Sequence, residues 1–115
     1  MAFTEFEIAE YDKLVATFIS KRRPPENIRD EVDLAYRITD QSIVIFEIRP
    51  TWSDKSVKIE ENIAKTTYVR KHNYWKVFWM RADLKWHVYQ PESKVSSLEE
   101  FLKLVTKDEF CCFWG

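Results

Sequence analysis

Two aromatic runs that flank a short polar break, in residues 74–89, constrain the fold of this chain more than any other feature. The stretch reads YWKVFWMRADLKWHVY and holds three of the five tryptophans. Aromatic and β-branched residues favour strands, so the break at 81–85 predicts the turn of a β-hairpin. Each ring buries roughly 150–250 Å² when it is covered. The face with Trp75, Trp79 and Trp86 is therefore expected to supply much of the stability.

Length and composition limit the classes of protein that the chain can form. Its 115 residues fit one domain, over 1–115, which buries about two thirds of the unfolded surface. A single glycine excludes the Walker and dinucleotide-binding phosphate loops, because both need several glycines. No apolar run reaches the roughly 20 residues of a membrane span, and the first residues lack the basic and apolar segments of a signal peptide. We therefore expect a cytoplasmic protein without membrane contact.

The N-terminal part has the pattern of a capped helix. Thr4 and Glu7 form a capping box, and Phe3 and Ile8 have the spacing of a hydrophobic staple, so a helix is expected over residues 4–20, before a Pro-Pro pair that stops it. Its predicted core stripe consists of Ile8, Tyr11, Leu14, Val15, Phe18 and Ile19.

A hairpin is expected next. Residues 31–39 alternate apolar and polar side chains, and a two-residue turn at 40–41 leads into a second strand at 42–49. A turn of this length pairs Leu34 with Glu47 and Asp33 with Ile48. Asp33 and Glu47 are therefore predicted to emerge on opposite faces of the sheet.

The remaining chain completes the sheet and adds a second helix. Residues 51–63 show no clear period and are interpreted as a long loop. A helix capped by Ser96 or Ser97 should follow the last strand, with a buried stripe of Leu98, Phe101, Leu102 and Val105. Strands are expected at 64–70, 74–81 and 85–89. The predicted fold class is α+β, an antiparallel sheet of about five strands with an N-terminal and a C-terminal helix packed on it.

Six short motifs carry a resemblance to a known family. They are MAFTEFE at 1–7, KRRPP at 21–25, FEIRP at 46–50, FWMRADLKWHVYQP at 78–91, SLEEFL at 97–102 and CFWG at 112–115. Together they make nearly the whole chain similar to a small bacterial family of single-domain proteins known only as a domain of unknown function. The resemblance implies a bacterial cytoplasmic protein and brings no activity, substrate or catalytic residue.

One pair of carboxylates offers an enzymatic alternative. Asp33 with Glu47 and Arg49 is similar to the D…ExK arrangement of restriction-endonuclease-like nucleases, in which two carboxylates hold Mg²⁺ and a lysine positions the attacking water. Here Arg49 replaces the lysine, and an arginine stays protonated, so it does not accept a proton from water. The turn also separates the carboxylates. We therefore interpret the chain as non-catalytic, with a Mg-dependent nuclease that uses Asp33 and Glu47 as the alternative.

Other residues that often carry chemistry are sparse. His72 lies in a predicted turn and His87 on a strand, and neither has a second histidine or cysteine at ligand spacing, so no zinc or other metal site and no cofactor is expected. Cys111 and Cys112 are adjacent, which is poor spacing for an ordinary disulfide. They are expected to be reduced residues that contribute to packing.

A binding surface is the favoured function. Residues 65–91 contain six basic residues and one acidic residue, a net charge of +5 in a chain whose total is −1. If the turns have even lengths, alternation places rings and positive charges together on one face of the last three strands. Such a face suits single-stranded nucleic acid, a protein partner or a homodimer interface, and all three remain open. The candidate binding residues are Lys65, Lys76, Phe78, Lys85, His87 and Tyr89; Met80 shares their predicted face, and Trp75, Val77, Trp79, Trp86 and Val88 are expected on the other.

Overall fold

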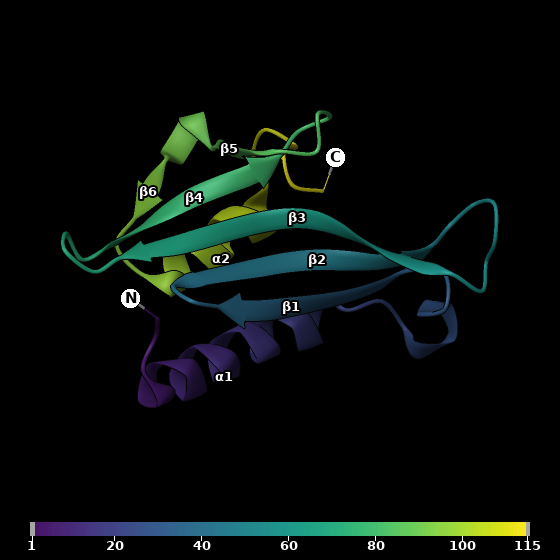
Figure 1. Ribbon diagram of the computed structural model, residues 1–115, viewed down its shortest axis with the longest axis horizontal. Helices are drawn as coiled ribbons and strands as arrows, with labels where there is room; N and C mark the ends of the chain where they lie inside the picture. The colour runs from purple at the N-terminus through teal and green to yellow at the C-terminus, as the bar shows by residue number, and fades with distance from the viewer. Residues whose placement is uncertain (1, 115) are drawn as a thin grey trace.

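The computed structural model describes residues 2–114 and places both helices against one antiparallel sheet (Figure 1). Met1 and Gly115, the outer residues of two sequence motifs, lie outside this range. The helices are α1 (Glu5–Arg22) and α2 (Leu98–Lys107), and the short 3₁₀ helices are η1 (Glu26–Ile28) and η2 (Gln90–Glu92). The strands are β1 (Asp33–Thr39), β2 (Ser42–Pro50), β3 (Lys58–Val69), β4 (Tyr74–Met80), β5 (Trp86–Val88) and β6 (Lys94–Val95).

The predicted α+β architecture is confirmed, with the antiparallel sheet between the two helices in the chain. The part of the chain that the structure describes forms six strands rather than about five. Their order is β1-β2-β3-β4-β5, and β6 also pairs with β4. The extra strand, β6, has only two residues, which is too short for a periodic pattern in the sequence.

Helix α1 begins at the predicted capping box. The Thr4 amide donates to Glu7 Oε1 at 2.9 Å, and the Glu7 amide donates to Thr4 Oγ1 at 3.1 Å. The predicted staple is wrong, because Ile8 is 42% exposed. Phe3 instead packs against Tyr11, with ring centroids 5.0 Å apart, and against Trp75 at 5.8 Å. This ring cluster fills the space beside the first turns of α1, so Ile8 has no place in the core.

The hairpin turns use residues with positive φ. Asp40, with φ of 53°, lies in the predicted turn between β1 and β2, and Asn73, with φ of 55°, ends the turn between β3 and β4. Aspartate and asparagine are enriched in this backbone region. In the turn after β4, the residue with positive φ is Leu84, at 61°.

The predicted loop over residues 51–63 is correct for residues 51–57, whereas residues 58–63 are strand. Lys58 is the first residue of β3, and β3 pairs with β2 from there on. Only these two strands pair beyond Ile48, so residues 49–59 form an arm that projects from the sheet (Figure 1). The arm exposes both faces, so its sequence shows no alternation. Its tip is ordered by a hydrogen bond from the Thr51 amide to the Val57 carbonyl at 2.8 Å.

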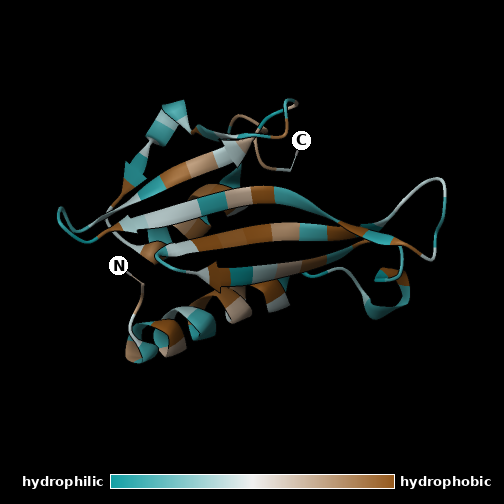
Figure 2. Cartoon of the chain, in the orientation of Figure 1, coloured by the Kyte–Doolittle hydropathy of each residue, from teal (hydrophilic) through white to brown (hydrophobic). Residues whose placement is uncertain are grey.

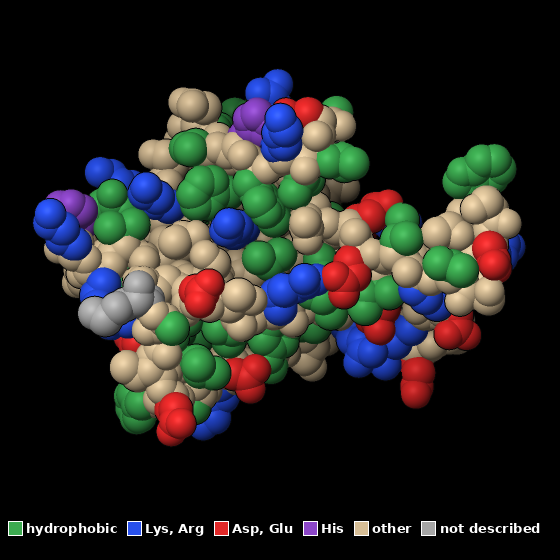
Figure 3. All heavy atoms as spheres, in the orientation of Figure 1, with side chains coloured by type: hydrophobic (Ala, Val, Ile, Leu, Met, Phe, Trp, Pro, Cys, Tyr) green, Lys and Arg blue, Asp and Glu red, His purple; other side chains and the backbone are tan. Residues whose placement is uncertain are grey.

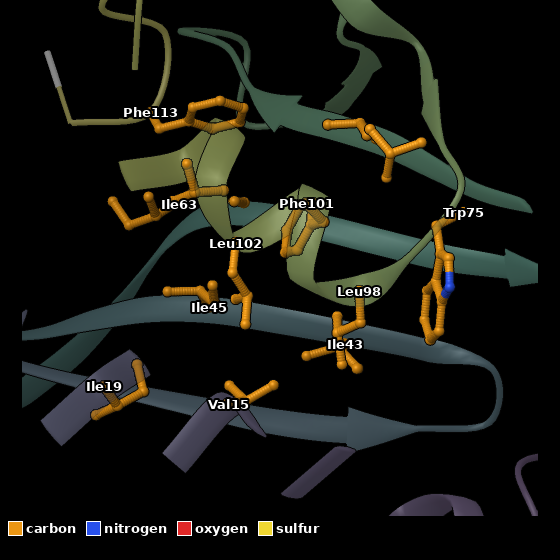
Figure 4. Close-up of a cluster of buried hydrophobic side chains, with 14 of the residues drawn as sticks. Val15, Ile19, Ile43, Ile45, Ile63, Trp75, Leu98, Phe101, Leu102 and Phe113 are labelled. Atoms are coloured by element: carbon orange, nitrogen blue, oxygen red, sulfur yellow. The ribbon is translucent and has the colours of Figure 1, made fainter. Parts of the chain in front are cut away.

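The core lies between the sheet and the two helices (Figure 4). The register of β2 against β3 shifts between Ile45 and Phe46, and both Ile63 and Ala64 of β3 are buried. The hydropathy of the chain agrees with the position of the core: the middle of β2 is hydrophobic, and the turns are hydrophilic (Figure 2). The predicted α2 stripe is confirmed. The buried helix residues are Val15, Ile19, Leu98, Phe101, Leu102 and Val105, and they meet Ile43, Ile45, Trp75 and Val77 of the sheet.

Two arginine–carboxylate pairs connect the ends of α1 to the sheet. Arg70, just after β3, donates to both Glu7 oxygens at 2.9 and 3.2 Å, and Arg23 donates to both Asp33 oxygens at 2.7 and 2.8 Å. The pKa of Glu7 and the pKa of Asp33 are both lowered to about 2, mainly because these guanidinium groups donate hydrogen bonds to the carboxylates.

We expect these pairs to make stability depend on acid pH. A carboxylate with a lower pKa in the folded state stabilises the fold above its unfolded pKa, and this contribution is lost as pH falls through the folded pKa. The free energy of unfolding should therefore decrease between about pH 5 and pH 2. Glu7→Gln should flatten this dependence, measured by urea unfolding at several pH values. Arg70→Gln should flatten it by a smaller amount, because the Thr4 amide still donates to the Glu7 carboxylate. A wild-type slope in both variants would contradict this account.

Candidate functional site

In the part of the chain that the structure describes, one face of the sheet has no helix on it. Side chains of α1 and α2 both contact the opposite face, where the core lies. The uncovered face, called the open face below, is turned toward the viewer in Figure 3. Hydrophobic and basic side chains mix over β3 and β4 in this view, whereas most acidic side chains lie over α1 and the arm. Residues 62–82 contain no aspartate or glutamate at all.

The strand registers define which residues share the open face. Residues directly opposite each other in an antiparallel ladder lie on the same face of the sheet. The pairs on the open face are Lys65 with Phe78, Thr67 with Lys76, Val69 with Tyr74, Phe78 with Val88, Met80 with Trp86, and Lys76 with Lys94.

Half of the predicted binding set lies on the open face. Lys65, Lys76 and Phe78 are there, whereas Lys85 lies in the turn before β5. His87 and Tyr89 lie on the core face, which corrects the prediction.

The predicted faces of β5 were wrong because the prediction assumed a different register between β4 and β5. Met80 pairs with Trp86, so the turn between them has five residues and not the even number that was assumed. A shift of one residue moves every side chain of a strand to the other face. Trp86 and Val88 therefore occupy the open face in place of His87 and Tyr89.

Tyr89 is part of the core. It is 1% exposed and packs against Phe113, with ring centroids 4.9 Å apart. Burial raises the pKa of its hydroxyl, which has no hydrogen-bond partner among residues 2–114. His87 has a different contact, since its Nε2 lies 2.8 Å from Asp83 Oδ2 in the turn. Neither side chain contributes to the open face.

Cations and rings are interleaved on the open face. Lys65 Nζ lies 5.6 Å from the ring centroid of Phe78 and 5.8 Å from that of Trp86. Lys94 Nζ lies 5.0 Å from the ring centroid of Tyr74. These distances are within the range of cation–π contacts. Among residues 2–114, neither lysine has a carboxylate in salt-bridge contact.

Lys76 and Lys94 are direct cross-strand partners on β4 and β6. Like charges opposite each other in a sheet destabilise it, and both side chains are exposed. Both lysines line a hollow of about 270 Å³ on the surface. Its lining consists of Tyr74, Lys76, Phe78, Val88, Ser93 and Lys94.

The two nuclease carboxylates are separated, as predicted. Asp33 pairs with Ile48 and Glu47 pairs with Leu34, so their side chains leave the sheet on opposite faces. Each carboxylate already has an arginine, because Arg23 binds Asp33 and Arg49 contacts Glu47 at 3.2 to 3.4 Å. Over residues 2–114, no three His, Cys, Asp or Glu side chains are grouped as a metal site requires. This geometry does not favour the nuclease.

The cysteines are free, and only one of them packs. Cys112 is partly buried against the core, and burial raises the pKa of its thiol. Cys111 is exposed with φ of 57°, so the packing role predicted for it is wrong.

The predicted set did not include the aromatic residues Tyr74 and Trp86 or the basic residue Lys94 of the open face. Tyr74 alternates with Lys76 and Phe78, so the period of two in the sequence was sufficient to find it. Trp86 was placed on the wrong face by the assumed turn length. Lys94 lies on the open face because β6 pairs with β4, and the sequence carries no signal for a strand of two residues.

The fold and the open face define a small α+β domain with helices on one face of an antiparallel sheet and a mixed aromatic and basic surface on the other. The chain belongs to the family described as DUF3024, a domain of unknown function, which matches residues 3–115. The resemblance to a family of unknown function is thereby confirmed. No curated protein and no solved structure matches the chain. None of the helices in residues 2–114 is long and apolar enough to cross a membrane.

Proposed function

We propose that this protein is a non-catalytic binding module that holds single-stranded nucleic acid on the open face of β3 to β6. The observation that carries the proposal is the direct cross-strand pairing of Lys76 with Lys94 beside a hollow that is also lined by Tyr74 and Phe78. Two like charges in this position repel each other, and a phosphate group between them would relieve the repulsion. The ligand class therefore contains closely spaced anionic groups.

The rings beside the lysines supply a second part of the recognition. Phe78, Trp86 and Tyr74 are all partly exposed on the same face. Unpaired bases stack on such rings, while lysines contact the phosphates between them. Bases in a duplex are already stacked and do not reach the rings, so single strands are favoured. A cytoplasmic location, which gives access to RNA, is part of the proposal.

Self-association through this face is less compatible with its charges. A second copy placed face to face on the first would bring Lys65, Lys76 and Lys94 close to their own counterparts. Strands β4 to β6 contain no carboxylate to compensate them, and Glu60, on the open face of β3, is already paired with Arg37. Lysine is also depleted in protein interfaces, which bury their central residues. An acidic protein partner remains as an outcome of the test.

The test is a binding titration with fluorescein-labelled oligo-dT and oligo-U of about 10 nucleotides, at salt concentrations between about 0.05 and 0.2 M. We expect Trp86→Ala to weaken binding by about 1–3 kcal/mol through lost stacking. Lys94→Ala and Lys76→Ala should each lower the slope of affinity against salt by about one. Fluorescence anisotropy measures both effects.

The matched control is Trp52→Ala, because Trp52 is 96% exposed at the tip of the arm, away from the open face. It should bind like the wild type, and circular dichroism should show that all variants fold. Equal losses in Trp86→Ala and Trp52→Ala would contradict the proposed face. Competition by polyglutamate as strong as that by unlabelled oligonucleotide would overturn the nucleic-acid assignment in favour of an acidic protein.

A further inference from the structure

A second surface lies on helix α1, on the side of the helix that is turned away from the core. Val15 and Ile19 of α1 are buried against the sheet, whereas Phe6 is 79% exposed. Phe6 comes about two and a half turns before Val15, so the two side chains leave the helix on opposite sides. Figure 1 shows α1 at the lower edge of the molecule, with the sheet on one side of it.

The residues around Phe6 form a stripe along the helix. Side chains that follow each other at spacings of three and four residues share one side of an α-helix. The stripe that starts at Phe6 lines a groove of about 580 Å³, and Glu99 of α2 also lines this groove. The residues of the α1 stripe are Phe6, Ala9, Glu10, Lys13, Leu14 and Thr17.

The order of residues in the α1 stripe is symmetric in size and charge. The midpoint of the stripe lies between Tyr11 and Asp12. The pairs at equal distances from it are Phe6 with Thr17, Ala9 with Leu14, and Glu10 with Lys13. Reversal of the helix direction therefore exchanges a large side chain for a small one in two pairs, and an acid for a base in the third.

This order makes the α1 stripe complementary to itself. In a two-fold symmetric dimer, a residue that contacts a second residue of the other copy is matched by the reciprocal contact. If two copies of α1 pack antiparallel around the midpoint, each Phe6 lies level with a Thr17, and each Glu10 lies level with a Lys13. Parallel packing would place Glu10 level with Glu10, so the charges favour the antiparallel direction.

The side chains of the α1 stripe are available for these contacts. Within residues 2–114, Glu10 and Lys13 form no salt bridge, and both are exposed. Thr17 Oγ1 donates to the Lys13 carbonyl at 2.9 Å, so its hydroxyl keeps a partner when a ring covers it. Ala9 is exposed and small, which allows the two helices to approach closely.

We infer that two copies of this chain associate as a symmetric dimer through antiparallel α1 helices. Phe6 of each copy packs beside Thr17 of the other, and Glu10 pairs with Lys13 twice. One pair of helices buries less than the roughly 1,600 Å² of a standard interface, so the dimer should be weak, with a Kd of about 10–100 μM. Because α1 contacts the face of the sheet opposite the open face, this dimer does not depend on the binding of nucleic acid.

Charge exchange between two variants tests the pairing. Sedimentation equilibrium of the full-length chain, at about 1 to 300 μM, measures the dimer. Glu10→Lys and Lys13→Glu should each weaken it about tenfold or more, because symmetry converts two attractive contacts into repulsive ones. An equal mixture of the two variants should form a heterodimer with about the wild-type affinity, since acid again faces base in both pairs. A folding defect in either variant would not recover on mixing.

Phe6→Ala tests the apolar contact. It should weaken the dimer about tenfold or more, because the ring is buried only in the dimer. Phe110→Ala is the matched control, since Phe110 is 57% exposed and lies outside the groove, and it should dimerise like the wild type. A monomer over the whole concentration range, a dimer that the charge variants do not weaken, a mixture that stays monomeric, or an equal loss in Phe110→Ala would each overturn the inference.

Discussion

Replacing Trp75 by alanine should lower the free energy of unfolding by about 3–5 kcal/mol, because truncation of a large buried ring leaves a cavity. Trp75 is 3% exposed and lies among other rings. Its ring centroid is 4.9 Å from that of Tyr68, 5.1 Å from that of Tyr11 and 5.8 Å from that of Phe3. The cluster joins the N-terminus, α1, β3 and β4, so its loss affects the whole fold. Urea unfolding followed by circular dichroism gives the change.

The chain offers a control with the same chemistry. Trp52→Ala removes an indole that is 96% exposed and should change stability by no more than about 0.5 kcal/mol. If Trp75→Ala does not fold, Trp75→Phe keeps part of the ring volume and still gives a measurable loss. Equal stabilities of the Trp75→Ala and Trp52→Ala variants would show that this ring cluster is not the core.

Asp108→Ala should give the second largest loss, about 2–4 kcal/mol, because its carboxylate accepts two backbone hydrogen bonds and hydrogen bonds to charged groups contribute strongly. Asp108 follows α2 in the left-handed conformation, with φ of 42°. Its oxygens accept from the amides of Phe113 at 3.0 Å and Trp114 at 2.9 Å. Alanine provides no acceptor and fits this backbone region poorly.

Asp108→Ala should also loosen the C-terminal segment, in addition to lowering the stability of the whole fold. Asp108 folds the C-terminal segment back, which buries Phe113 against Tyr89 and lets Trp114 Nε1 donate to the Val105 carbonyl at 2.8 Å. Asp108→Ala should therefore make the amides of Phe113 and Trp114 exchange faster with solvent. Asp108→Asn tolerates the left-handed backbone and keeps one acceptor, so its stability should be intermediate. A wild-type exchange rate in the alanine variant would contradict the proposed role.

Effects on stability and effects on binding should separate within one hairpin. Trp75 on β4 faces the core, whereas Trp86 on β5 faces outward beside Met80. A substitution at the first position should unfold the protein more easily, and a substitution at the second should weaken the ligand. The aromatic stretch that dominates the sequence therefore serves the core with one set of rings and the candidate site with another.

The sequence alone determined the features that depend on neighbouring residues. The capping box of Thr4 and Glu7, the buried stripe of α2 and the turn at Asp40 follow from local hydrogen bonds and helical or strand periods, and each was predicted. The same is true of the first hairpin, where a two-residue turn fixes the register and so separates Asp33 from Glu47.

Only the tertiary structure decided the features that depend on partners distant in sequence. The strand character of residues 58–63 comes from pairing with β2, which charged side chains on both faces do not reveal. The five-residue turn before Trp86 assigned the faces of β5, and the pairing of Lys94 with Lys76 created the opposed lysines of the candidate site. A backbone hydrogen bond between strands does not depend on which side chains they carry, so such pairings leave little trace in the sequence.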